Sequence, residues 1–458
     1  MFNKRTAFLF LFISLLLLSY SGFTQIKISA IQIEGNAKTK SYIIARELPY
    51  RVGDVVANDS LSLLNIIAQQ QLFNTALFLE VVVEANNVDS ASVAIHIKVK
   101  ERWYFFPIPY FRWVDRNFSE WWTVNHRSLD RVNYGLNLKQ ANATGNNDKL
   151  TLGFITGYTH QTIVKYQFPY FDKKLKYGLG VSWLSFSQKE INNETLNDKQ
   201  VFYKTIGVIQ KGYRGSASLL YRPNLFERHS MQLGVGENEI SDSALLNQPR
   251  LLPNFKKSFS YADLTLSFTK VKFNYNAYPS NGASTEIAVY QRFSAASNLT
   301  SFQFRQVYVH PFTKSRFVLL ESNSVAKFLP NQNYLDSKLM GYGNMQMNGL
   351  EYYVIDGNAA SLLRAQIHQS LGAVRTKSVL SQKYFPEIKF QIWLKAFSNL
   401  GYVYSEHPNN SSKLSNTLLK TVGVGIDITG MYDFVLKIDY SVNQLGDKGV
   451  YLHGGVNF

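Results

Sequence analysis

The sequence ends on Gly-Val-Tyr-Leu-His-Gly-Gly-Val-Asn-Phe, residues 449–458, in which apolar and polar side chains alternate. One face of the extended strand that this predicts carries Val450, Leu452, Val456 and Phe458. The other face carries Tyr451, His453 and Asn457. In a soluble sheet such a last strand is an exposed edge, whereas a transmembrane barrel pairs its last strand with its first. This stretch therefore favours a barrel, and the preceding chain must supply the other strands.

The composition of the 458 residues fits a barrel better than a helical enzyme. There are 28 Tyr and 32 Phe but only 6 Met, as expected for aromatic girdles at membrane interfaces. Cysteine is absent, which excludes a disulfide framework, a lipoprotein anchor and a thiolate metal site. The formal net charge is +16, but Lys and Arg are scattered singly. We therefore expect contact with anionic lipid head groups and no nucleic-acid partner.

Residues 1–24 have the pattern of an export signal. Lys4 and Arg5 precede the apolar run from Ala7 to Leu18, and small and polar residues follow before Gln25. A retained membrane helix would need a longer apolar run, and no later segment has one. An exported chain without a membrane helix can span a membrane only as a barrel.

Residues 25–102 have the pattern of a small α/β domain. The alternation in the first strand slips at Ser29-Ala30, which predicts a bulge. A short helix capped by Thr39 or Ser41 and a second helix starting at Asn58 follow, and then strands over 77–83 and 91–99. The order of elements resembles a single POTRA domain, the periplasmic module that precedes assembly and translocation barrels. The phrases that carry this resemblance are Ile33-Glu34-Gly35-Asn36, Gly53-Asp54 and the run from Leu72 to Phe78.

Residues 103–458 lose the helical periodicity and contain strand-like runs separated by Asn, Asp, Gly and Pro clusters. The candidate strands are 103–114, 130–142, 148–160, 161–170, 175–188, 211–223, 229–240, 260–275, 282–294, 300–312, 315–328, 359–371, 387–404, 420–431, 433–444 and 449–458. These sixteen segments predict a mainly β fold, a 16-stranded antiparallel transmembrane β-barrel with both ends on the periplasmic side. Residues 200–210 fit either a loop or a strand extension.

Catalytic and cofactor motifs are not evident in the sequence. It has no Gly-x-Ser-x-Gly elbow, no His-Glu-x-x-His and no phosphate loop, and its 8 His are dispersed. We therefore expect no enzyme activity, no cofactor and no metal. An outer-membrane lipase, with Ser, His and a carboxylate meeting at a rim, remains an alternative.

The long interruption at residues 331–358 is the candidate functional segment, because long loops with apolar content are usually functional. Five candidate strands follow it. Here the chain resembles the BamA/TamA-type superfamily of outer-membrane assembly barrels, whose loop before the fifth-from-last strand enters the lumen. The resemblance places the loop tip, aliphatic-Arg-Gly-aromatic in that family, on Met347, Asn348, Gly349 and Leu350.

The charged partners of that tip are also replaced. The resemblance implies two carboxylates on the following strands, at positions that Gln366 and Asn399 occupy here. A buried charge without its partner is costly, so the joint loss of Arg and carboxylates is physically coherent. We expect a docked loop held by neutral hydrogen bonds among Asn348, Gln366 and Asn399. The alternative is an alignment displaced by a residue or two.

The resemblance implies an outer-membrane protein that assists the insertion or translocation of client proteins. Clients would add to a strand edge of the POTRA domain and then to a weak seam between residues 105–113 and 449–458. Expected partners are clients, assembly accessory proteins and outer-membrane lipid. Two alternatives remain: secretion of a dedicated passenger, as in two-partner secretion, and a structural or diffusion pore that has lost assembly activity.

Overall fold

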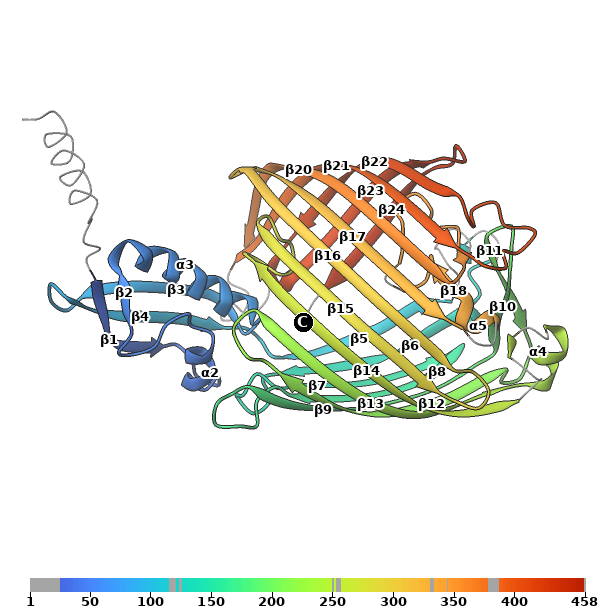
Figure 1. Ribbon diagram of the computed structural model, residues 1–458, viewed down its shortest axis with the longest axis horizontal. Coiled ribbons are helices and arrows are strands. Elements are labelled where there is room, and N and C mark those ends of the chain that lie inside the picture. The colour runs from blue at the N-terminus through green and yellow to red at the C-terminus, as the bar shows by residue number, and fades with distance from the viewer. Residues whose placement is uncertain are drawn as a thin grey trace, which may run out of the picture.

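The computed structural model describes residues 25–114, 121–122, 126–248, 251–252, 257–329, 333–343, 345–377 and 387–456. The export signal expected over 1–24 and the terminal Phe458 lie outside these residues. The chain forms a small α/β domain at one end of a large β-barrel (Figure 1). No helix in the described ranges is long and apolar enough to cross a membrane.

The small domain is a four-stranded sheet with two helices. Its elements are β1 (Gln25–Glu34), α2 (Ser41–Arg46), β2 (Val55–Ala57), α3 (Asn58–Asn74), β3 (Phe78–Asn87) and β4 (Ser92–Glu101). The strand order is β2-β1-β4-β3, and the core between sheet and helices includes the buried side chains of Ile28, Leu72 and Ile97. The order of helices and longer strands was predicted from the sequence. The three-residue β2 was not, because so short a segment has no periodicity to detect.

Two local predictions in this domain have different outcomes. The pairing of β1 with β4 shifts register between Ile28 and Ala30, so the predicted bulge is confirmed. The predicted helix cap is wrong, because Lys40 is the N-cap of α2 and no side chain caps it. The Thr39 hydroxyl instead lies 3.1 Å from the Tyr104 hydroxyl, where the domain meets the barrel.

All sixteen predicted barrel strands are present within a few residues of the expected bounds. They are β5 (Phe105–Trp113), β6 (Val132–Ala141), β7 (Lys149–Gly157), β8 (Thr159–Phe168), β9 (Tyr177–Gln188), β12 (Gln210–Tyr221), β13 (Glu227–Ile240), β14 (Ser258–Phe273), β15 (Gly282–Phe293), β16 (Leu299–Thr313), β17 (Arg316–Phe328), β20 (Ala359–Lys377), β21 (Glu387–Tyr404), β22 (Leu418–Thr429), β23 (Phe434–Asn443) and β24 (Lys448–Val456). Each pairs antiparallel with its neighbours in one 16-stranded sheet. The predicted fold class is therefore confirmed.

Side chains on the barrel strands alternate between an apolar outer face and a more polar inner face. On β21, Leu394, Leu400 and Tyr402 are exposed on the outside, while Lys395 and Asn399 are buried on the inside. This period of two explains why the strands could be located from the sequence.

The end of the barrel far from the small domain carries additional elements (Figure 1). They are the hairpin β10 (Glu190–Leu196) and β11 (Lys199–Lys204), α4 (Asp242–Asn247), α5 (Tyr334–Ser337), β18 (Lys338–Met340) and β19 (Ile355–Asp356). Of residues 200–210, for which the sequence left loop and strand extension open, 200–204 belong to this separate hairpin, 205–209 connect it to the barrel, and Gln210 begins β12. An apolar cluster that includes Ile191 and Leu245 packs the hairpin against α4.

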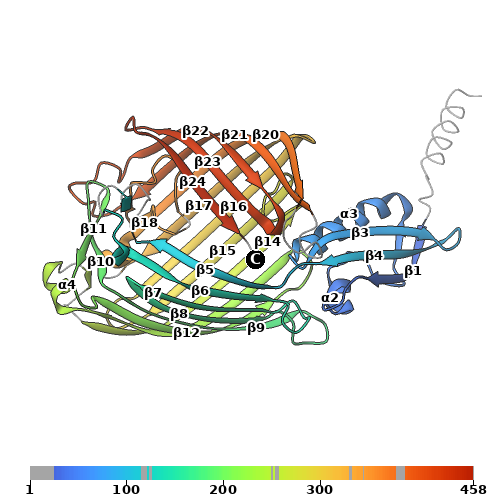
Figure 2. The same ribbon diagram turned by 180° about the vertical axis from the view of Figure 1, so that it is seen from behind.

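The sheet ends with β5 at one edge and β24 at the other. No backbone ladder joins these two strands over residues 105–113 and 448–456, which are both described. Figure 2 views the barrel from the side on which the two edges face each other. The first and last strands are therefore neighbours whose edges are not paired, unlike the closed pairing that the terminal stretch suggested.

Candidate functional site

The segment between β17 and β20 packs against the inner wall of the barrel. Met347 and Leu350 are 2% and 4% exposed and belong to one apolar cluster with the wall residues Leu362 and Leu419. Leu362 is an inner-face residue, because its neighbours along β20 are exposed on the outside. Burial of this apolar surface, rather than a salt bridge at the tip, holds most of the segment in place.

Two glycines allow the loop to approach the wall closely. A Cβ at Gly401 on β21 would lie 3.0 Å from the Met347 sulfur, so a side chain there would crowd Met347 at the loop tip. Gly349 has φ +89°, a conformation that L side chains rarely adopt. The chain therefore turns at Gly349 between the two buried apolar residues of the tip.

The loop tip binds a charged group and not the expected neutral one. The Asn348 amide donates to the Asp439 carboxylate over 2.9 Å. The Lys395 ammonium lies 2.8 Å from Asp439 and 2.8 Å from Asp427, and all three side chains are almost fully buried. The cation of this group is thus a lysine on the wall, which lies between two carboxylates.

The two expected amide partners make other contacts. Gln366 pairs with the His368 ring at 3.1 Å, and Asn399 donates to the Thr421 hydroxyl at 2.9 Å. Neither contact involves Asn348, so the partner set differs from the one expected. Lys395, Asp427 and Asp439 lie on β21, β22 and β23, and nothing in the sequence indicated that they meet.

A second group of charges holds the loop backbone. Arg364 on β20 pairs with Glu321 on β17 at 3.0 Å and donates to the Gln346 carbonyl. Glu321 also pairs with Arg305 on β16 at 2.8 Å. Guanidinium groups and carboxylates from three neighbouring wall strands therefore fix the residue before the tip.

The loop also contacts the last two strands. The Asn443 amide donates to the Gly349 carbonyl at 2.9 Å, and Glu351 lies 3.3 Å from the His453 ring on β24. The rings of Tyr352 and Tyr451 are 5.8 Å apart. Val450 and Leu452 point the other way and are 70% and 69% exposed. The side chain of Val456 lies outside the described residues, so the predicted closing face is seen at two of its four positions.

The POTRA-like domain is joined to the barrel turns by a buried ion pair. The Arg222 guanidinium, in the turn between β12 and β13, binds both oxygens of Glu47, which follows α2. Burial tends to raise the pKa of the Glu47 carboxyl, but the charge and hydrogen bonds of Arg222 outweigh it, so the pKa lies below the ordinary value. Glu47 is therefore held as a carboxylate between the two domains.

A second buried contact lies at the start of the barrel. Arg102 binds the Asp433 carboxylate at 2.9 Å, and the Tyr275 hydroxyl donates to the same carboxylate at 2.6 Å. Asp433 lies in the turn before β23 and Tyr275 in the turn after β14. The end of the small domain is thus tied to two widely separated turns at the same end of the barrel.

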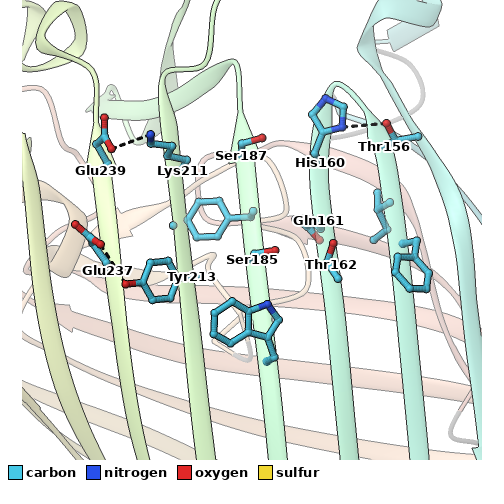
Figure 3. Close-up of a pocket in the computed structure, with 15 residues that line it drawn as sticks. Thr156, His160, Gln161, Thr162, Ser185, Ser187, Lys211, Tyr213, Glu237 and Glu239 are labelled. Carbon is cyan, nitrogen blue, oxygen red and sulfur yellow. Dashed lines mark hydrogen bonds and ion pairs between the residues drawn. The ribbon is translucent and has the colours of Figure 1, made fainter.

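The outer wall carries a hollow of about 680 Å³ across strands β7 to β13 (Figure 3). Trp183 and Tyr213 line it, Tyr213 donates to Glu237 at 3.2 Å, and Lys211 pairs with Glu239 at 2.9 Å. Aromatic rings beside charged groups are typical of the girdle at a membrane interface. The described residues contain no group of three or more His, Cys, Asp or Glu that could hold a metal ion.

Comparisons with known proteins agree with this architecture. Residues 26–102 match the family model POTRA, surface antigen variable number repeat. No curated protein matches the chain. BamA from Haemophilus ducreyi lacking POTRA domains 1–3 is similar in structure with a TM-score of 0.51, covering 94% of this chain and 85% of that chain at 14% identity.

CdiB from Escherichia coli is similar to the same degree. Its TM-score is 0.54, and the match covers 95% of this chain and 77% of that chain at 12% identity. At these identities the likeness shows the fold. Residues 26–102 are therefore a POTRA domain, and the chain as a whole has the fold of the BamA- and CdiB-type barrels, as the sequence resemblance predicted.

Proposed function

We propose that this chain is an outer-membrane protein that assists client proteins to insert into or cross the membrane. The observation that carries the proposal is the pair of unjoined edges, β5 and β24, in a barrel directly attached to a POTRA domain. An unpaired backbone group in hydrocarbon costs on the order of several kcal/mol. A client strand that pairs with such an edge is therefore strongly stabilised, without nucleotide or metal.

The POTRA domain offers a first edge to an extended client. Among the described strands, β3 pairs with β4 alone and lies at one edge of the small sheet. Val88 N–H donates to Ser92 C=O, so the backbone groups of even-numbered residues of β3 bond to β4. The backbone groups of Val83 and Ala85 therefore point to the free edge. The Gln69 side-chain amide already donates a hydrogen bond to the Val81 carbonyl at 2.7 Å. A client strand would add beside Val83 and Ala85 through main-chain hydrogen bonds.

The placement in the membrane follows from the same architecture. The outward-facing apolar side chains would contact outer-membrane lipid, and the POTRA domain would lie in the periplasm. Clients, and accessory proteins that deliver them, are the partners implied.

The contents of the lumen favour assembly over a diffusion pore. The loop packs on the wall through an apolar cluster, and the POTRA domain is tied to turns at its own end of the barrel by Glu47 and Arg102. A pore that had lost assembly activity would have no physical need for either arrangement. Secretion of one dedicated passenger stays an alternative, because the similarity to CdiB is as high as that to BamA.

The experiment is depletion of the chain followed by quantitative outer-membrane proteomics, with rescue by wild type and by a seam-locked variant. The natural chain has 0 Cys, so paired cysteines such as Phe111→Cys with Val450→Cys can lock β5 to β24. Because β5 and β24 are not paired, their relative register is not defined, and Leu452→Cys is the second position on β24 to combine with Phe111→Cys. Each single-cysteine variant is the matched control, and reduction of the disulfide should restore function.

Each outcome identifies one function. Loss of many barrels, rescued by wild type and by the reduced variant but not by the locked one, supports general assembly through the seam. Loss of one surface or secreted protein alone would indicate a dedicated transporter. If only the depleted chain disappears, or if the locked variant rescues fully, the assembly proposal fails.

A further inference from the structure

The free edge of β5 lacks hydrogen-bond donors at its centre. Ala141 N–H donates to Tyr104 C=O at 2.8 Å, and Val114 N–H donates to Arg131 C=O at 2.9 Å. In the register of β5 with β6, these contacts make the even-numbered residues of β5 the ones that bond to β6. The odd-numbered residues therefore direct their backbone groups to the free edge, and two of them, Pro107 and Pro109, have no N–H.

A side chain blocks part of what remains of that edge. The Trp103 indole N–H donates to the Phe105 carbonyl. Among the odd-numbered residues of β5, Phe111 and Trp113 at the far end are the two whose N–H and C=O are both present and bind no group of the described residues. Proline has no N–H to donate to a neighbouring strand, so in sheets it is confined to edges and bulges. For the same reason, the free edge of β5 is a poor partner for an added strand.

The free edge of β24 has no such gap. Asn443 N–H donates to Asp447 C=O at 3.1 Å, in the same register that pairs β23 with β24. Odd-numbered residues of β24 therefore bond to β23, and the even-numbered ones point to the free edge. Those residues are Lys448, Val450, Leu452, Gly454 and Val456, and each has an N–H and a C=O. No backbone contact of the described residues uses these groups.

We propose that β24, and not β5, is the edge that accepts an added strand, and that Pro107 and Pro109 keep β5 from occupying that place itself. The occupant is an extended client strand that runs antiparallel to β24. Its outward side chains would be apolar beside Val450 and Leu452, which are the highly exposed residues of this strand. Its other face would lie beside Tyr451 and His453, which the lumen loop holds through Tyr352 and Glu351.

This inference rests on the proposed function for the identity of the occupant, but its test does not need a client. The probe is a synthetic peptide copying residues 104–114, with Pro107→Val, Pro109→Val and Phe111→Cys. The matched control peptide keeps both prolines. Each peptide is added to the full chain in lipid nanodiscs, carrying either Leu452→Cys on β24 or Phe111→Cys on β5, and disulfide adducts are measured.

We expect the valine peptide to cross-link to the β24 variant about tenfold more than to the β5 variant, because only β24 offers a continuous ladder. The proline peptide should give about tenfold less adduct at β24, because it lacks the same two donors. In a barrel with Pro107→Val and Pro109→Val, the native β5 should now pair with β24 and reduce the adduct to a similar extent. Equal heat stability of the cysteine variants establishes that all are folded.

Three results would overturn the inference: adducts of equal yield on both edges, more adduct on β5, or no adduct on either. Its failure is distinguishable from failure of the proposed function. If depletion removes client barrels but no peptide adds to β24, the function stands and this edge is not the acceptor. If the peptide adds to β24 but depletion changes no other protein, the edge is real and the assembly function is wrong.

Discussion

At the scale of single residues, the lumen site is built around Lys395 and two buried carboxylates. Lys395 lies 2.8 Å from each of Asp427 and Asp439, and the Asn348 amide connects the loop to this group. A buried charge that loses its partner is much more costly than a neutral pair. The loop thus contributes a neutral amide to a group whose positive and negative charges both come from the wall.

Replacing Lys395 should be the most damaging single change in the lumen. Lys395→Met removes the ammonium group that lies 2.8 Å from both buried carboxylates, and we expect a loss of about 3–5 kcal/mol in the free energy of unfolding. Urea unfolding in lipid vesicles measures it. Adding Asp427→Asn and Asp439→Asn to the same variant should recover much of the loss. A triple variant as unstable as the single one would mean that Lys395 acts by packing alone.

A smaller change at the loop tip tests the contact with Asp439. Asn348→Asp replaces a donor with a carboxylate facing Asp439, and we expect a loss of about 1–3 kcal/mol, larger than for Asn348→Ala. The readout is the heat-unfolding midpoint together with protease cleavage within residues 331–358. If Asp and Ala have equal effects, the Asn348 contact does not hold the loop.

At the scale of elements, the loop and the closing strand form one unit. The loop touches β23 through Asn443 and β24 through Tyr451 and His453, so the strand at the free edge is supported from inside. On its outer face, Val450 and Leu452 are 70% and 69% exposed. Under the proposed function, support of the inner face would pre-organise the open backbone edge and reduce the cost of pairing with an added strand.

Removing the loop should open the lumen. Replacing residues 333–356 with a short Gly-Ser linker removes the apolar side chains packed on Leu362 and Leu419, and we expect a clear rise in single-channel conductance in planar bilayers. An equal linker inserted after Asp89, in the exposed turn between β3 and β4, is the control. Unchanged conductance would show that the loop does not obstruct the lumen.

At the scale of the whole molecule, the POTRA domain and barrel are joined through turns distant in sequence. Glu47 pairs with Arg222, and Arg102 pairs with Asp433. Both pairs are buried, so the orientation of the domain depends on groups that must stay charged. This attachment places the β3 edge of the domain at a defined position relative to the barrel.

Acid should weaken this attachment through Glu47. Its pKa in the folded protein lies below the ordinary 4.5, so the ion pair stabilises docking above that value and loses its effect as the pH falls from 4.5 through the folded-state pKa. Spin-label distances between the POTRA domain and a barrel turn should broaden in that range. Glu47→Gln should broaden them already at neutral pH, whereas Glu80→Gln, at an exposed pair with Lys100, should not. Distances that stay sharp in Glu47→Gln would contradict this role.

The sequence by itself determined the strands, because the alternation of side chains is local. Sixteen segments, the bulge after Ile28, and the helices and longer strands of the POTRA domain follow from periods and turn residues that lie within a few positions of each other. The position of the long loop between strands was determined in the same way.

Only the tertiary structure decided which groups meet in the lumen and at the seam. Asn348 and Asp439 are 91 positions apart, and Glu47 and Arg222 are 175 apart. The alternation along a strand shows which charged residues face the lumen but not which of them are in contact, since every second residue of every strand points into the same lumen. Pro107 and Pro109 were visible in the sequence. That their missing N–H groups face β24 depends on the hydrogen-bond register with β6, which the sequence pattern does not specify.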